Sequence, residues 1–219
     1  MQINSTGNSL FSTTYTGNTR STPAKSAGFA AALSAAQQSP NASAASDTSQ
    51  SFGTDQGTLT LDMDSYFKPG NFRPDQPLLL PTAANIQALG KSVDAHMGRF
   101  LAANNIPSAP ASIRYGADGQ MELPADYPYA QQFKAALAQD SVLDHELNAL
   151  NGLSSQFADL EKLAPYTEAL SQAKTETEAA AVFARYSYLF APGSRSSAIE
   201  LGFSADGKVT VRADGKALG

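Results

Sequence analysis

The chain has 219 residues, a formal net charge of −5 at pH 7 and no cysteine. The missing cysteine excludes disulfides, thiolate nucleophiles and cysteine-ligated metal sites. The acidic balance argues against nucleic-acid and anionic-membrane partners, because both bind basic patches. No apolar run approaches the roughly 20 residues of a membrane span.

Residues 1–50 are predicted to form a disordered tail. Ser, Thr, Asn, Gln, Gly and Ala make up 38 of these 50 positions, and only Arg20, Lys25 and Asp47 are charged. Such a segment buries too little apolar surface to offset the entropy lost on ordering. Its first residues also lack the basic start and apolar core of a secretory signal peptide. We therefore expect a protein that is cytoplasmic in the producing cell or secreted without a cleavable Sec signal.

Residues 51–81 are expected to be an extended, proline-rich arm that packs on the folded domain. The alternation from Thr58 to Met63 predicts one short strand. Four prolines at positions 69, 74, 77 and 81 then argue against regular structure. The apolar side chains that should anchor the arm are Leu78, Leu79 and Leu80.

The folded domain is predicted to open with two helices on either side of a hairpin. Thr82 caps the first helix, whose apolar stripe at helical spacing continues to about Asn104. The second helix begins near Asp126 and is expected to end at Gly152. A break in this helix is expected at Asp140, where a capping pair follows.

Two further helices are predicted toward the C-terminus. The third covers residues 154–173, and Pro165 is expected to kink or split it. Its side chains expected to point inward are Phe157, Leu160, Leu163 and Leu170. Thr175 and Glu178 have the spacing of a capping box and begin the fourth helix, which closes at Pro192.

Two segments, 113–126 and 201–214, repeat one hairpin pattern. Each has Asp-Gly between alternating apolar residues, which is a strong signal for a tight β-turn. A lone two-stranded hairpin is only marginally stable in water, so the copies either pair into a four-stranded sheet or each lie on helices. The predicted fold class is α+β: a mainly helical domain at 82–219 with two similar Asp-Gly β-hairpins, preceded by the disordered tail.

The sequence shows no catalytic or metal-ligand constellation. His96 and His145 lie on the polar flanks of helical stripes, so both are expected to be solvated at the surface. Acidic residues adjoin them, but residues one or two apart on a helix do not face each other. A zinc site needs three or four convergent ligands. We therefore predict no metal, no cofactor and no small-molecule ligand.

An enzyme is the alternative from another functional class. It would be a hydrolase or transferase whose active site is assembled from scattered residues, with His145, Glu146 and Arg195 as the candidate catalytic residues. This alternative requires the three side chains to share one cleft. The loop at 193–197 is expected to be a helix-to-strand connector rather than an anion-binding nest.

The passage FLAANNIPSAP at 100–110, followed by the ADG hairpin and then ADYP before a helix, resembles a pattern in uncharacterised bacterial proteins, many of them proteobacterial. The resemblance covers about a third of the chain and implies no particular chemistry. The Ser/Thr/Asn-rich, charge-poor start is similar to the unfolded export signals of type III and flagellar secretion substrates. That similarity implies export without a Sec signal.

The leading hypothesis is a non-enzymatic bacterial protein with an α+β interaction domain behind a disordered tail, exported in the manner of a type III substrate. A protein partner is expected, and neither nucleic acid nor a membrane span is. A cytoplasmic regulatory or chaperone-like module, with the tail as a tether, is the further alternative. Most of the aromatic residues Tyr127, Tyr129, Tyr186, Tyr188 and Phe190 are expected in the core or at an interface.

Overall fold

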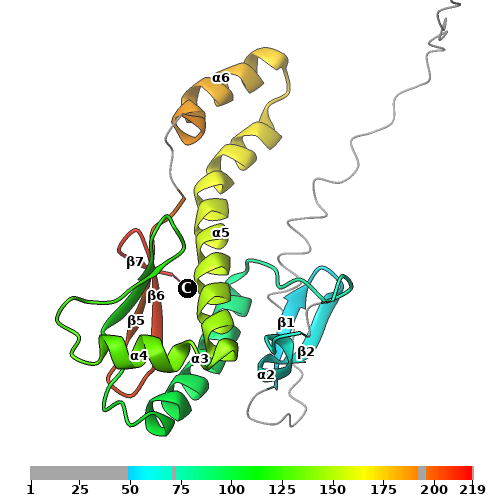
Figure 1. The fold of residues 1–219 in the computed structure, drawn as a ribbon. Coiled ribbons are helices and arrows are strands. Elements are labelled where there is room, and N and C mark those ends of the chain that lie inside the picture. Colours follow the sequence, from blue (N-terminus) through cyan, green and yellow to red (C-terminus); the bar gives the residue numbers. More distant parts are fainter. Residues whose placement is uncertain (1–48, 71–72, 192–195, 219) are drawn as a thin grey trace, which may run out of the picture.

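A computed structural model describes residues 49–70, 73–191 and 196–218 (Figure 1). The elements in chain order are β1 Ser49–Thr54, β2 Gly57–Asp62, α2 Met63–Tyr66, α3 Ala83–Ala103, β3 Ser112–Tyr115, β4 Met121–Glu122, α4 Ala130–Leu137, α5 Ser141–Gln172, α6 Glu176–Tyr186, the 3-10 turn η1 Ser187–Phe190, β5 Ile199–Phe203, β6 Val209–Ala213 and β7 Lys216–Ala217. The predicted α+β class is confirmed. The tail predicted at 1–50 lies outside the described residues, except for Ser49 and Gln50, which begin β1.

The two Asp-Gly hairpins pair into one antiparallel sheet. Its strand order is β4-β3-β5-β6-β7, and the hairpins join where Ile113 of β3 pairs with Leu201 of β5. Both of these side chains are fully buried. The sheet also packs on α3. Gly207 in the second turn lies so close to this helix that an added Cβ would be 3.0 Å from the Met97 side chain. The sequence left the pairing open, and the structure shows both pairing and helix packing.

A second, two-stranded sheet begins the described chain. Strands β1 and β2 form an antiparallel hairpin, whereas the sequence predicted a single strand in an extended arm. Phe52 of β1 and Met63 at the start of α2 are both fully buried, so this unit belongs to the core rather than lying on it. The β1 sequence, SQSFGT, carries one large apolar side chain and therefore gave no alternation to detect.

Asn85 attaches this hairpin to α3. Its side-chain amide forms two hydrogen bonds with the backbone of Gly53, accepting from the N–H at 2.8 Å and donating to the carbonyl at 2.7 Å. A third bond reaches the carbonyl of Leu80 at 2.8 Å. The amide thus acts as a neighbouring strand would, and its own helix is capped by Thr82, as predicted.

Helix α5 is longer than the sequence indicated. The break before it is where we expected it, and Asp140 is its N-cap, accepting from the Leu143 N–H at 3.1 Å. The expected end at Gly152 is wrong, because Leu150 and Leu153 are buried around it. That packing outweighs the roughly 1 kcal/mol that glycine costs a helix interior. The helix also continues past Pro165 as one element, and its last turns lean away from the axis of the rest (Figure 1).

The last turns of α5, together with α6 and η1, form a distal arm at residues 159–190 that projects beyond the sheet (Figure 1). The last buried residue of α5 is Ala158, and α6 contains none. The inward orientation expected for Leu160 and Leu170 is therefore wrong, since both are exposed. The predicted capping box between Thr175 and Glu178 is present at the start of α6. No helix within the described ranges is long and apolar enough to span a bilayer.

We expect Asn85→Ala to lower the free energy of unfolding by about 2–3 kcal/mol, because each buried polar group left without a partner costs about 1–3 kcal/mol. Urea denaturation would measure this loss. The matched control is Asn148→Ala, which removes an exposed amide that donates to the Asp144 carbonyl within its own helix. An equal loss in both variants would contradict the attachment role of Asn85.

Candidate functional site

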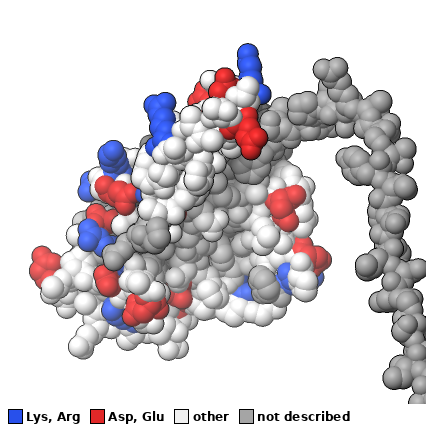
Figure 2. Space-filling view, turned by 90° about the horizontal axis from the view of Figure 1, so that it is seen from above, with Lys and Arg blue, Asp and Glu red and all other residues white. Residues whose placement is uncertain are grey.

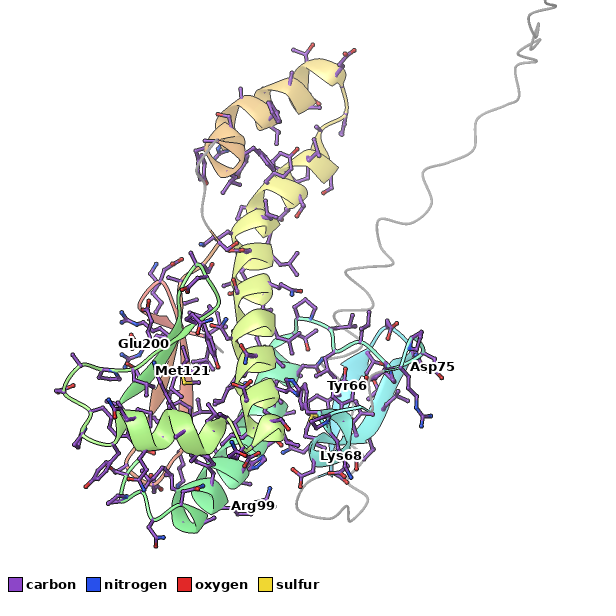
Figure 3. The ribbon with its side chains drawn as sticks, in the orientation of Figure 1. Tyr66, Lys68, Asp75, Arg99, Met121 and Glu200 are labelled. Atoms are coloured by element: carbon purple, nitrogen blue, oxygen red, sulfur yellow. The ribbon has the colours of Figure 1, made fainter. Side chains whose placement is uncertain are left out.

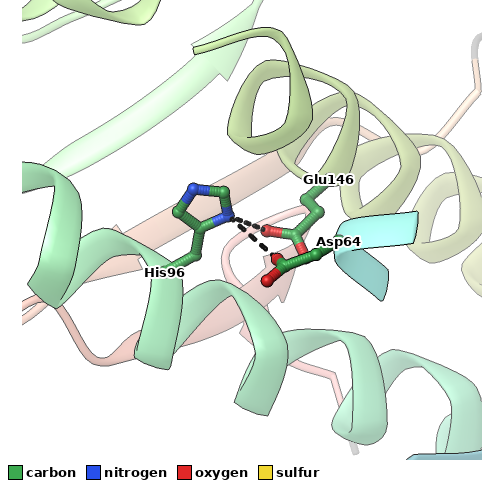
Figure 4. A group of neighbouring side chains, drawn as sticks. All are labelled: Asp64, His96 and Glu146. Carbon is green, nitrogen blue, oxygen red and sulfur yellow. Dashed lines mark hydrogen bonds and ion pairs between the residues drawn. The ribbon is translucent and has the colours of Figure 1, made fainter. Parts of the chain in front are cut away.

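One cluster of acidic and imidazole side chains forms where three helices meet. Asp64 comes from α2, His96 from α3 and Glu146 from the first turns of α5 (Figure 4). One donor atom from each lies within 4.8 Å of the others. The three residues are far apart in the chain, so only the tertiary fold assembles the cluster.

Glu146 is the most unusual member, because its carboxylate is completely buried. Its Oε1 accepts a hydrogen bond from Ser92 Oγ at 2.7 Å, and its Oε2 lies 3.0 Å from His96 Nδ1. A buried carboxylate is costly unless it is hydrogen-bonded or paired with a positive group. Both oxygens of Glu146 therefore depend on α3.

His96 is held between carboxylates on both sides of its ring. Its side chain is only 12% exposed, and Nε2 lies 3.1 Å from Asp140 Oδ2. On the other side, Nδ1 faces Glu146 and also lies 3.9 Å from Asp64 Oδ1. Asp64 is 43% exposed, so the cluster opens to solvent on that side. Arg99 places Nη2 3.6 Å from the same Asp64 oxygen.

The acidic surroundings of His96 favour its protonated form. Burial lowers the pKa of His96, but the hydrogen bond and charge of Glu146, together with those of Asp140, outweigh burial and raise the pKa above its ordinary value. Ring protonation at both nitrogens would supply a donor to each carboxylate. Without a metal, the two acids thus favour a protonated ring at His96.

The prediction that both histidines are solvated is wrong for His96, which is 12% exposed and whose acidic partners come from α2, the N-cap of α5 and α5 rather than from sequence neighbours. Asp94, two residues away, instead accepts from the backbone N–H of Val209. His145 is exposed, as expected, and its Nδ1 lies 3.1 Å from the carbonyl oxygen of Phe67.

The structure describes two of the three candidate catalytic residues, and these two do not point to one site. His145 and Glu146 are consecutive on α5 and diverge: His145 contacts the segment after α2, whereas Glu146 contacts α3. Arg195 lies outside the described residues. His145 instead lines a pocket of about 450 Å³ with Tyr66, Phe67, Lys68, Pro69, Gly70, Gln76 and Leu78. Tyr66 and Lys68 lie on the β1–β2 side of the molecule, opposite Met121 and Glu200 (Figure 3).

Sequence reasoning missed the roles of Asp64, His96 and Asp140 in this cluster. A usable signal existed for Glu146, which falls within the apolar stripe of Leu143, Leu147 and Leu150. A charged residue at such a position must be buried with a partner. Nothing in the sequence indicated that this partner would be His96, because α3 and α5 are separated by a hairpin and a helix.

The distal arm carries a second candidate site, made of exposed aromatic rings. Phe183, Tyr188 and Phe190 are 54%, 65% and 48% exposed, respectively. Phe183 stacks on Phe190 with ring centroids 5.9 Å apart, and Phe190 meets Tyr166 edge-to-face at 5.2 Å. Contiguous apolar patches of this kind mark interaction surfaces.

Charges of both signs are interspersed on the face shown in Figure 2. Two ion pairs illustrate this: Arg114 pairs with Glu200 on the sheet, and Lys162 of the arm lies 2.9 Å from Asp214. No protein-family model, curated protein or solved structure matches the chain. Its function must therefore be inferred from the cluster and the arm themselves.

We expect the metal-free protein to become less stable as the pH rises through the folded-state pKa of His96. That pKa is raised, so the stability contributed by protonated His96 is fully present below its ordinary pKa of about 6.5 and is lost above the folded value. The facing groups are Glu146, Asp140 and Asp64. Urea unfolding between about pH 6 and 9 with a chelator would measure this.

His96→Gln should flatten that pH profile, whereas His145→Gln should leave it unchanged. Both variants remove one histidine side chain, His96 from α3 and His145 from α5. Identical profiles for both variants and the parent protein would show that His96 does not carry the pH dependence.

Proposed function

We propose that this is a non-enzymatic bacterial interaction protein that binds a protein partner through its distal arm. The observation that carries the proposal is the exposure of Phe183, Tyr188 and Phe190 on an arm whose helix α6 buries no residue. Two of the three candidate catalytic residues, His145 and Glu146, face different neighbours, and this also favours binding over catalysis.

Covering the arm would be energetically favourable. Burial of apolar surface contributes roughly 25 cal/mol per Å², and aromatic side chains are enriched among the residues that dominate binding energy. The arm is also ordered before binding, because the capping box starts α6 and Tyr166 packs edge-to-face on Tyr186 at 5.8 Å. A preordered arm loses less conformational entropy when a partner binds.

The expected partner presents an apolar surface with few charges of its own. The arm carries charges of both signs. Its positive residues include Lys162 and Arg185, and its negative residues include Glu168, Glu176 and Glu178. This mixture does not form the basic surface that a nucleic acid would require. Steric fit to the aromatic rings, rather than charge attraction, should decide which protein binds.

The tail supports export as part of the same proposal. Its Ser/Thr/Asn-rich composition is similar to that of type III and flagellar export signals. The body of the protein would then act on a target outside the producing cell. Retention in the producing cell would favour the regulatory or chaperone-like alternative.

We expect Tyr188→Ser to weaken partner binding without unfolding the arm, because its ring is the most exposed of the three. The triple change of Phe183, Tyr188 and Phe190 to Ser should weaken binding by about 30-fold or more, as loss of hot-spot aromatics does. Affinity capture with quantitative mass spectrometry would identify proteins that depend on the arm. Titration of a purified candidate would then give the change in Kd.

The matched control for this experiment is Leu78→Ser, which removes an exposed apolar side chain from the body rather than from the arm. Circular dichroism would verify that α6 remains helical in each variant. Equal binding by the triple variant and the parent protein would overturn the proposal. Loss of self-association alone would make the partner a second copy of this chain.

We expect residues 1–50, fused to a reporter that cannot leave the cell alone, to carry it into the medium only in strains with a working type III or flagellar apparatus. A tail with its residue order shuffled at constant composition would show whether composition alone suffices. Retention of both the reporter and the full-length protein in every strain would remove the export hypothesis and leave the arm-binding hypothesis standing.

A further inference from the structure

We propose that Asp64, His96 and Glu146 bind one divalent transition-metal ion. Nδ1 of His96 faces Oδ1 of Asp64 and Oε2 of Glu146, and these are the proposed donor atoms. This site is independent of the distal arm, and the proposal does not rest on the function proposed for that arm. It differs from the expectation drawn from the sequence, which held two isolated histidines insufficient for metal binding.

The separations between donor atoms suit a small ion. Nδ1 of His96 lies 3.0 Å from Glu146 Oε2 and 3.9 Å from Asp64 Oδ1. One donor atom from each of the three residues lies within 4.8 Å of the others. Zinc bound at about 2.0–2.1 Å in a tetrahedron places its ligand atoms about 3.3 Å apart. The two distances from His96 Nδ1 bracket that value, so a small movement of the partly buried Asp64 would complete the geometry.

The hydrogen bonds of His96 also point to a cation. When Nε2–H donates to Asp140, the neutral ring leaves an unprotonated Nδ1, and its lone pair then faces the carboxylate oxygens of Glu146 and Asp64. Three acceptors directed at one point repel each other unless a positive group lies among them. A proton on Nδ1 or a metal ion can fill that role, and the metal uses all three acceptors at once.

Each proposed ligand has a partner that fixes its orientation. Asp140 holds the far nitrogen of His96 at 3.1 Å, Ser92 holds the second oxygen of Glu146 at 2.7 Å, and Arg99 lies 3.6 Å from Asp64. A carboxylate on the second imidazole nitrogen is the usual support of a metal-bound histidine. A simple surface ion pair does not need supporting residues such as Asp140 and Ser92.

Charge and access are also compatible with an ion. With His96 neutral, the carboxylates of Asp64, Glu146 and Asp140 and the guanidinium of Arg99 leave a local excess of two negative charges, which a divalent cation balances. Asp64 is 43% exposed and gives a route from solvent, whereas Glu146 is fully buried and shields the opposite side.

The donor set of one imidazole and two carboxylates favours zinc or another first-row transition metal. Calcium and magnesium prefer all-oxygen coordination, whereas imidazole suits zinc, iron, nickel and copper. Zinc is therefore the probe to use, with magnesium as the comparison ion. The ligands supplied by the protein number three, so a tetrahedral ion would keep one position for water.

The test is calorimetric titration of the full-length, chelator-treated protein with zinc at one fixed pH, accompanied by thermal melting with and without zinc. We expect one zinc ion per chain and a melting temperature that rises with zinc concentration, as for any ligand that binds the folded state. His96→Gln should weaken zinc binding by about 100-fold. Asp140→Asn, which keeps an oxygen able to cap α5 but removes the charge beside His96, should weaken it by roughly 10-fold or more.

His145→Gln is the matched control and should bind zinc as the parent protein does, since it removes the other histidine of the chain. Asp64→Asn covers the case in which a buried variant fails to fold, because Asp64 is only partly buried and lies in a four-residue helix. Equal zinc affinity in the parent, His96→Gln and Asp64→Asn proteins would overturn the proposal. Absence of saturable one-to-one binding would leave the cluster as an ion pair that only joins α3 to α5.

Discussion

Helix α3 is the element on which the other units of the described fold depend. One face carries Asn85, whose amide completes the backbone hydrogen bonding of β1. Another face carries Asp94, which accepts from the backbone of β6. Ser92 and His96 form a third contact, with the buried carboxylate of Glu146. Polar side chains thus fix the position of each neighbour, while the apolar stripe of α3 supplies most of the burial.

Much of this fold could be predicted because its signals are local. The N-cap Thr82, the capping box at Thr175 and the two Asp-Gly turns each lie within a few residues of the structure they produce. The pairing of Ile113 with Leu201 could not be derived in the same way. The repeat suggested it, but contact between distant hairpins depends on how the intervening helices pack. Strand β1 escaped prediction because only Phe52 marks its buried face.

The acidic cluster was beyond sequence reasoning for a related reason. A histidine is interpreted from its neighbours on one helix, whereas the partners of His96 come from α2, from the cap of α5 and from its second turn. Glu146 alone gave a signal, since a carboxylate in an apolar stripe needs a partner once buried. The end of α5 was missed because propensity places a stop at Gly152, and tertiary packing overrides it.

Pro165 has a mechanical consequence for α5. Proline has no backbone N–H, so the carbonyl four residues earlier, on Glu161, receives no helical hydrogen bond from it. This gap falls just beyond Ala158, the last buried residue of α5. The helix is therefore packed in the core up to Ala158, and it loses one backbone hydrogen bond just beyond that residue. Thermal bending should concentrate there, so the aromatic rings can change their direction while the body remains undistorted.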